Sequence, residues 1–274
     1  MAVRIFDVHQ HFGLVQVAQG PANAAAEWDL DKDYQQRIAV MDRFGITQCA
    51  ISPTQQYERP NGQADTRRFN DIAAEYKRRY KDRFPVALGT VELLHGEKEG
   101  LAELERMAGE LKLDGVVWHH HFQGTAMVDR RMWPFLKKTA ELKLPAVVHV
   151  MAESMLESAW LLEVLAVAFP EVTFLGLAGL TGLTQSRYLL GICKRCPNIY
   201  LDTAALFSLG RLLEEYIEHI GSERILFGSD LYLDPLTYEV PYVLLGILES
   251  RGILGPDKEN ILWKNSHRLF KLPS

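Results

Sequence analysis

Cysteine is scarce in this 274-residue sequence, and the three that it contains are too few and odd in number to build a disulfide framework. Such usage is typical of a reducing compartment. Cys193 and Cys196 form an isolated C-x-x-C that is followed by Pro197. Because no second pair and no thioredoxin-like context accompany this motif, we expect a helix end that carries two buried thiols.

Long apolar runs are also missing. The first residues, MAVRIFDVHQHFG, show neither the apolar run nor the small-residue cleavage site of a signal peptide. The most apolar stretch, residues 159–169, is interrupted by Glu163 and is too short to span a bilayer. We therefore expect a cytoplasmic protein with no membrane partner.

Charge of one sign is not massed anywhere in the chain, whose formal net charge is −5. The densest basic stretches, Arg67-Arg68 and Lys77-Arg78-Arg79, fall in a segment with helical periodicity, which favours a solvated helix face over a nucleic-acid surface. No G-x-G-x-x-G or G-x-x-x-x-G-K-[ST] follows an expected strand, which removes the usual nucleotide-binding folds. The expected partner is a small molecule, and a homo-oligomer remains open.

The chain does contain a regular alternation of short aliphatic runs and longer amphipathic segments. A hydrophobic fraction of 47% with 24% charged residues is that of a globular protein with a sizeable core. Strands that alternate with helices predict βαβ units and a parallel sheet, and eight units favour a closed (β/α)₈ TIM barrel, which needs about 250 residues. We expect one domain over residues 1–274. The expected strands are residues 3–8, 48–52, 86–91, 115–119, 146–150, 173–177, 199–203 and 225–229.

Helices and two long connections complete this expectation. Residues 209–220 carry one apolar stripe opposite three glutamates, and residues 257–270 predict a closing helical stretch. The connections at residues 12–30 and 53–65 are longer than a barrel needs, and both follow strands. Barrel enzymes keep their active sites on that face, so we interpret both as substrate-covering loops, with tolerated insertions as the alternative.

The histidines gather at the expected ends of strands. His9 and His11 are two residues apart and share one strand face, His149 ends the fifth strand, and Asp230 ends the eighth, beside the first. Each alone has an ordinary explanation, such as a buried histidine or a helix N-cap. Together they predict one divalent metal ion, for which Zn²⁺ is the preferred choice and Mn²⁺, Fe²⁺ or Co²⁺ also fit.

The motif FDVHQHFG, in which Asp7 leads His9 and His11, resembles the first strand of the amidohydrolase superfamily. It is most similar to the branch that includes aminocarboxymuconate-semialdehyde decarboxylase. The resemblance implies a barrel, a mononuclear metal at the four residues above, and hydrolysis or non-oxidative decarboxylation. Matching patches extend over nearly the whole chain and include RFPVALGTVEL, HHHFQG, LPAVVHV, NIYLDT, RILFGSDLYLDP and NILWKNSHRLFKL.

Two positions depart from the family pattern. The sixth strand of relatives ends in a histidine that acts as a base or orients metal-bound water, whereas this chain has Ala178. The fourth strand has Val117 where relatives carry a lysine. Another residue must then transfer the proton, a step that contributes about 10²–10⁴-fold. The candidates are His119, its same-face neighbour His121 if the strand continues, and Glu153.

Three functions follow from these residues. The first is a metal-dependent hydrolase of a small carboxylated or cyclic substrate, with Asp230 binding metal and accepting a proton. The second is a carboxy-lyase, in which Arg59 would hold the substrate carboxylate. The third is an atypical or non-catalytic binder, because of Ala178. We expect the substrate pocket to be lined by Tyr57, Arg59, Trp118 and Glu153.

Overall fold

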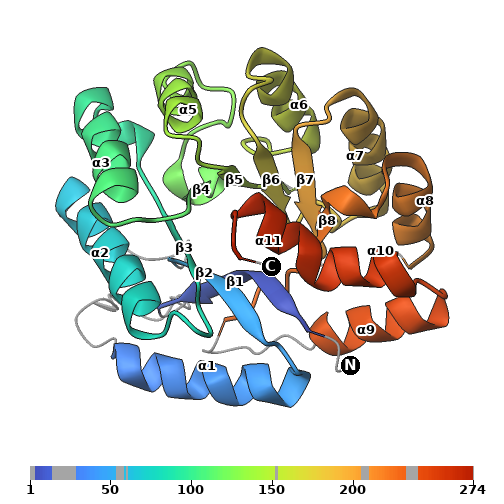
Figure 1. Cartoon of the computed structure of the whole chain (residues 1–274). Helices are drawn as coiled ribbons and strands as arrows, with labels where there is room; N and C mark the ends of the chain where they lie inside the picture. The colour runs from blue at the N-terminus through green and yellow to red at the C-terminus, as the bar shows by residue number, and fades with distance from the viewer. Residues whose placement is uncertain are drawn as a thin grey trace.

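Eight parallel strands form a barrel in sequence order, and helices alternate with them around the outside (Figure 1). The computed structural model describes residues 4–13, 29–53, 59, 61–151, 154–204, 210–232 and 240–273. The strands are β1 (Phe6–Phe12), β2 (Gln48–Pro53), β3 (Val86–Gly89), β4 (Gly115–Trp118), β5 (Ala146–His149), β6 (Phe174–Leu177), β7 (Ile199–Asp202) and β8 (Ile225–Leu226). The predicted fold class is confirmed.

The longer helices cover the outer face of the barrel, and one helix of four residues follows β4 at the barrel mouth. They are α1 (Leu30–Phe44), α2 (Gln63–Arg79), α3 (Glu97–Gly109), α4 (His120–Gln123), α5 (Met132–Glu141), α6 (Ala159–Ala168), α7 (Leu183–Arg195), α8 (Gly210–Ile220) and α9 (Val240–Ser250). The expected closing stretch is helical, but it is divided into α10 (Gly255–Glu259), a π-helical turn (Asn260–Lys264) and α11 (Asn265–Leu269). Within the described residues, no helix has the length and apolar character needed to cross a membrane.

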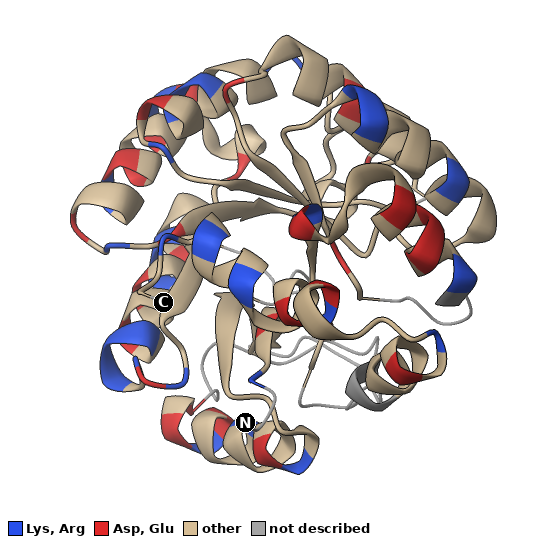
Figure 2. Ribbon diagram, turned by 45° about the vertical axis from the view of Figure 1, so that its right-hand side comes forward, with Lys and Arg blue, Asp and Glu red and all other residues tan. Residues whose placement is uncertain are grey.

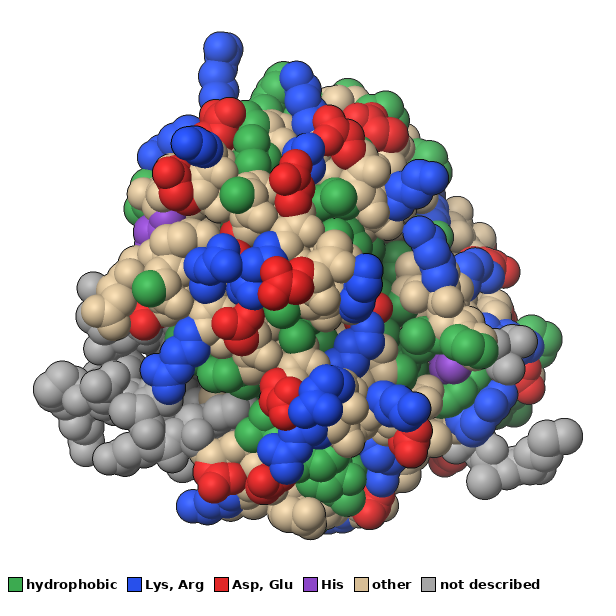
Figure 3. Space-filling view, turned by 60° about the vertical axis from the view of Figure 1, so that its left-hand side comes forward, with side chains coloured by type: hydrophobic (Ala, Val, Ile, Leu, Met, Phe, Trp, Pro, Cys, Tyr) green, Lys and Arg blue, Asp and Glu red, His purple; other side chains and the backbone are tan. Residues whose placement is uncertain are grey.

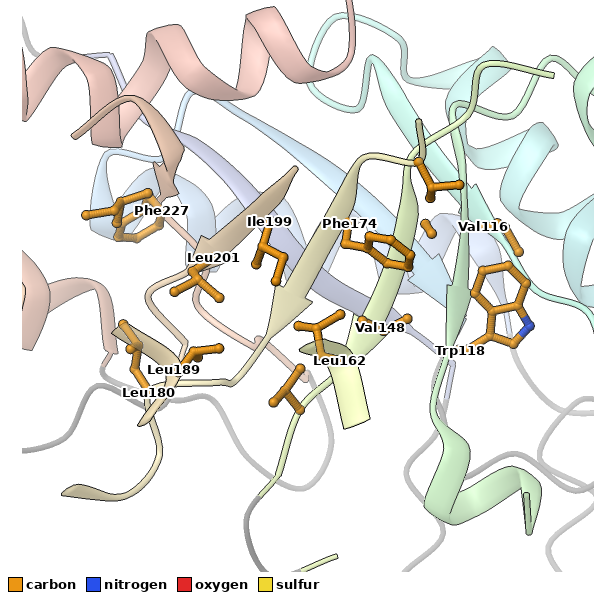
Figure 4. Packing of buried hydrophobic residues seen from close by; sticks show 14 of the residues in the cluster. Val116, Trp118, Val148, Leu162, Phe174, Leu180, Leu189, Ile199, Leu201 and Phe227 are labelled. Atoms are coloured by element: carbon orange, nitrogen blue, oxygen red, sulfur yellow. The ribbon is translucent and has the colours of Figure 1, made fainter. Parts of the chain in front are cut away.

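Alternate residues of each strand face two different cores. Val117 of β4 and Val147 of β5 belong to the cluster inside the barrel. Their neighbours Val116, Trp118 and Val148 belong to the larger cluster between barrel and helices (Figure 4). Because the faces alternate, the residue that follows Trp118 and the residue that follows Val148 face inward again. His119 and His149 therefore lie at the inner face of the barrel mouth.

Charged residues lie mainly on the outer helices (Figure 2), and both signs are mixed on the side that includes α2 and α3 (Figure 3). The basic stretches of α2 form ion pairs, with Arg67 2.8 Å from Glu103 and Lys77 2.7 Å from Asp114. The predicted solvated helix face is confirmed at Arg78, whose side chain is 71% exposed. Cys193 and Cys196 are free, buried thiols at the end of α7, as predicted.

The first strand differs from its prediction, because it runs from Phe6 to Phe12 and not over residues 3–8. Its pairing with β2 slips by one residue between Asp7 and Gln10, which is a β-bulge. The bulge reverses the alternation of faces. Val8 faces the interior cluster, whereas Phe12, an even number of residues later, faces the outer one. His9 and His11 therefore lie within the strand and face the barrel mouth.

Asp7 holds this bulge in place and ties β1 to the end of β8. Its buried carboxylate accepts hydrogen bonds from the backbone N–H of His9 (3.1 Å) and the side-chain amide of Gln10 (2.8 Å). It also accepts from the backbone N–H (3.0 Å) and the hydroxyl (2.5 Å) of Ser229. One side chain thus fixes both segments that carry the expected metal ligands.

Strands β3, β4, β5, β7 and β8 end earlier than the sequence predicts, and the early ends of β4 and β8 affect the site. β8 stops at Leu226, so Asp230 follows the strand instead of ending it. The backbone of Asp230 is in the left-handed region, with a φ of 56°. β4 stops at Trp118, and His120 to Gln123 turn into α4. His121 therefore lies on a helical turn and not on a continued strand, so it is no same-face neighbour of His119. Ala178, just beyond β6, is also left-handed, with φ 56°.

We predict that Asp7→Ala lowers the free energy of unfolding by about 3 kcal/mol. The reason is that two buried backbone donors lose their acceptor, each at a cost of about 1–3 kcal/mol. Asp42→Ala is the matched control: this carboxylate is exposed and pairs with Arg83, so its loss costs less than about 1 kcal/mol. Urea denaturation of both variants measures the difference. Equal stability of the two variants would show that Asp7 does not hold the barrel closed.

Candidate metal centre and active site

The site begins with two imidazoles of β1 whose rings are fixed from behind. Nδ1 of His9 lies 2.6 Å from the Asp202 carboxylate, and Nδ1 of His11 lies 3.0 Å from the carbonyl oxygen of Pro53. Both partners are acceptors only, so each Nδ1 carries a hydrogen. Gly228 makes the first contact possible, because a Cβ at that position would lie 2.6 Å from Oδ2 of Asp202.

This anchoring leaves two Nε2 lone pairs facing one another. The Nε2 atoms of His9 and His11 are 2.9 Å apart, and Oδ1 of Asp230 lies 3.1 Å from the first and 3.3 Å from the second. Three electron-rich atoms at such distances repel unless a cation lies among them. Two imidazoles and a carboxylate with anchored rear nitrogens form a donor set that fits a divalent transition metal.

Without a metal, the site attracts a proton instead. Burial alone lowers the pKa of His9, but the carboxylates of Asp230 and Asp202 outweigh it and raise the pKa to about 9. Burial lowers the pKa of His11, and the charge of His9 acts in the same direction. Although burial opposes ionisation of Asp230, His9 and His11 lower its pKa. The resting cluster therefore holds one cation among three groups.

A second group of donors lies across the barrel mouth. Oε1 of Glu157, in the loop before α6, lies 2.8 Å from Nδ1 of His149 and 2.5 Å from Nδ1 of His121. The other oxygen accepts the backbone N–H of His121 at 3.1 Å. Burial raises the pKa of Glu157, but these two imidazoles lower it to about 2, so the carboxylate stays ionised.

His119 lies between the two groups. Its ring centroid is 5.4 Å from that of His11 and 5.3 Å from that of His149. Its ligand atom lies within 4.8 Å of those of His9 and His11. Within the described part of the chain, its buried Nε2 makes no hydrogen bond. Burial and the neighbouring imidazoles hold the pKa of His119 well below its usual value, so the ring is neutral.

The expected pocket residues are not all placed at the site. Trp118 was predicted to contact substrate, but it is fully buried in the layer between barrel and helices, because alternation turns it away from the mouth (Figure 4). Arg59 forms an ion pair with Glu92 at 2.7 Å. Its role as a carboxylate clamp stays a prediction. Tyr57 and Glu153 lie outside the described residues.

Two residues of the site were not assigned a role from the sequence. Asp202 occurs in the motif NIYLDT at the end of β7, a position that faces the barrel mouth, and that placement was the available signal. Its Oδ1 also accepts a hydrogen bond from the backbone N–H of Ala178 at 2.8 Å. Asp202 therefore connects His9 to Ala178, the residue after β6 that departs from the family pattern. No sequence pattern pointed to Glu157, because it lies eight residues beyond His149 on a loop whose position is known only from the structure.

The chain belongs to the amidohydrolase family, whose model matches residues 6–272. No curated protein matches the sequence significantly.

Several solved structures share the fold. One is 5-carboxyvanillate decarboxylase from Novosphingobium aromaticivorans, complexed with manganese and 4-hydroxy-3-methoxy-5-nitrobenzoic acid, with a TM-score of 0.72, 17% identity and coverage of 98% of this chain and 96% of that one. Another is 2,6-dihydroxybenzoate decarboxylase from Rhizobium, with a TM-score of 0.69, 18% identity and 98% coverage of both chains. A third is 4-oxalomesaconate hydratase from Rhodopseudomonas palustris, with a TM-score of 0.70, 16% identity and coverage of 97% and 95%.

We predict that protein loaded with Mn²⁺ or Zn²⁺ retains about one equivalent after desalting, and that His11→Ala loses it. The barrel should stay folded, because the stability of this fold resides in the inner layers and the opposite face. His219→Ala, on the exposed face of α8, is the matched control and should retain the metal. Elemental analysis measures the content. Full retention by His11→Ala would refute the role of His11.

We also predict that metal binding at pH 7 releases about one proton, because His9 is protonated there and must lose that proton to ligate. A pKa raised to about 9 means that the release falls, and the apparent affinity stops rising, as the pH passes through 9. Calorimetric titrations in buffers of different ionisation enthalpy measure the number. Binding at pH 7 without proton release would contradict the protonated resting state of His9.

Proposed function

We propose that the protein is a metal-dependent carboxy-lyase that removes CO₂, without oxidation, from a small aromatic or unsaturated carboxylic acid. The observation that carries the proposal is the pair of anchored imidazoles whose Nε2 atoms face each other 2.9 Å apart beside Asp230. This arrangement suits a cation, and a bound cation can hold the carboxylate of an acidic substrate. Structures with the same fold support decarboxylation, since two of those named above are decarboxylases.

One divalent ion would be held by His9, His11, Asp230 and His149, the last through Nε2. The contact between Nδ1 of His149 and Glu157 fits this role, because ligating histidines usually have their other nitrogen anchored to an acceptor. When bound, the metal supplies a positive charge that orients the oxygens of the substrate. The manganese in a related structure makes Mn²⁺ as reasonable a choice as Zn²⁺.

The chain's own residues would then move one proton. His121, whose side chain is 24% exposed, is placed to exchange protons with solvent and to carry one to the substrate carbon. The bond between that carbon and the carboxylate breaks, its electron pair takes the proton, and CO₂ leaves. The ring of His119 is neutral and stands close to His9 and His11, which suits it less well to this step.

Hydrolysis, the first expectation from the sequence, is the second candidate. Asp230 would have to accept a proton from water, and its Oδ1 lies 3.1 Å and 3.3 Å from the Nε2 atoms of His9 and His11, beside the place proposed for the ion. The residue that would assist on β6 is Ala178, so the leaving group would lack its usual proton source. This gap weighs against hydrolysis, whereas in decarboxylation the departing CO₂ needs no proton, and the proton that the substrate carbon takes is assigned to His121.

We expect Mn²⁺-loaded protein to release CO₂ from at least one hydroxylated benzoic acid and, in D₂O, to place deuterium on the carbon that bore the carboxylate. His121→Asn should lower the turnover number by about 10²–10⁴-fold with little change in metal content. His219→Asn should behave as the wild type. Turnover of esters or lactones, with all acids left intact, would establish hydrolysis instead. A panel in which no substrate turns over would favour a binding protein.

A further inference from the structure

The Glu157 carboxylate contacts two histidines that the proposed function uses for different tasks. Its Oε1 lies 2.8 Å from Nδ1 of His149, the proposed ligand, and 2.5 Å from Nδ1 of His121, the proposed proton carrier. The two ring centroids are 5.4 Å apart. A single carboxylate oxygen thus contacts both the ring of His149, proposed to bind the ion, and the ring of His121, proposed to protonate the substrate.

The loop that carries Glu157 is held firmly at its backbone. The carbonyl oxygen of Glu157 accepts the N–H of Met151 at 3.1 Å, and that of Leu156 accepts the N–H of Met127 at 2.7 Å. These bonds tie the loop to the end of β5 and to the segment after α4. The side chain itself is fully buried. The carboxylate is therefore carried by a backbone that is hydrogen-bonded to two neighbouring segments.

The contact with His149 also fixes which nitrogen of that ring is free. A carboxylate accepts hydrogen bonds, so Nδ1 of His149 carries a hydrogen and Nε2 keeps its lone pair for a metal. Nδ1 of His121 lies at ion-pair distance from the same oxygen, without the geometry of a hydrogen bond. The carboxylate also accepts the backbone N–H of His121, which orients the first turn of α4. Among the described residues, Nδ1 of His121 makes no hydrogen bond, so His121 is anchored on this four-residue helix by its backbone bond and its ion pair with Glu157.

We propose, resting on the proposed function, that Glu157 is a positioning residue that couples metal binding by His149 to proton transfer by His121. Its effect on the metal runs through His149, and its effect on turnover runs through His121. The two effects can be measured separately, because metal affinity needs no substrate and turnover can be measured with the metal site saturated.

The test compares Glu157→Gln with the control Glu163→Gln, which removes an ion pair with Arg195 on the outer surface of α6. For Glu157→Gln we expect the Kd for Mn²⁺ to rise by about 10–100-fold. At saturating Mn²⁺, kcat should still fall by about 10-fold or more, with KM nearly unchanged. Glu163→Gln should match the wild type in all three. If Glu157→Gln does not fold, Glu157→Asp keeps the charge but cannot reach both rings, and should show the same loss of kcat.

A double-mutant cycle shows through which residue Glu157 acts. His121→Asn should lower kcat and leave Mn²⁺ affinity unchanged, and adding Glu157→Gln should lower kcat no further. Additive losses of kcat would overturn the proposal. So would a second Mn²⁺ equivalent in the wild type that Glu157→Gln removes, since Glu157 would then be a ligand. If no acid is decarboxylated, the proposed function fails, yet an unchanged Kd in Glu157→Gln would still refute the coupling to His149.

Discussion

The site depends on the hydrogen bonds that the buried carboxylate of Asp7 accepts. They join the bulge in β1 to Ser229 beyond β8, where the two ends of the barrel meet. Without the bulge, strict alternation would put Phe12 on the interior side with Val8 and would turn His11 away from the mouth. The same carboxylate therefore closes the barrel and faces both β1 imidazoles inward.

Hydrogen-bond acceptors behind each imidazole then determine which ring nitrogen is free to bind a cation. The Asp202 carboxylate, the carbonyl oxygen of Pro53 and the Glu157 carboxylate each receive an Nδ1–H, so the Nε2 lone pairs of His9 and His11 are left to face one another. Burial makes that arrangement unfavourable unless positive charge is present. The cluster therefore favours a cation, and the rest of the mouth is arranged around that charge.

Much of this arrangement could be predicted from the sequence, because strand period and parallel topology are local properties. The barrel, the shared face of His9 and His11, and the closeness of Asp230 to the first strand follow from these two rules. The bulge, which turns that shared face toward the barrel mouth, could not be predicted, since it depends on a contact with Ser229 more than 200 residues away. The place of His121 also involves a residue distant in the sequence, because its backbone N–H bonds to Glu157, 36 residues further on.

Anomalous diffraction from crystals grown with Zn²⁺ tests most directly the claim that the anchored imidazoles are built to hold one ion. The account predicts one strong peak at about 2.0–2.1 Å from the Nε2 atoms of His9, His11 and His149, with Asp230 as the fourth ligand. It also predicts that the Nδ1 contacts to Asp202 and Glu157 are retained. A mouth without a peak, or a peak bound by Glu157 and His121 in place of His9 and His11, would contradict it.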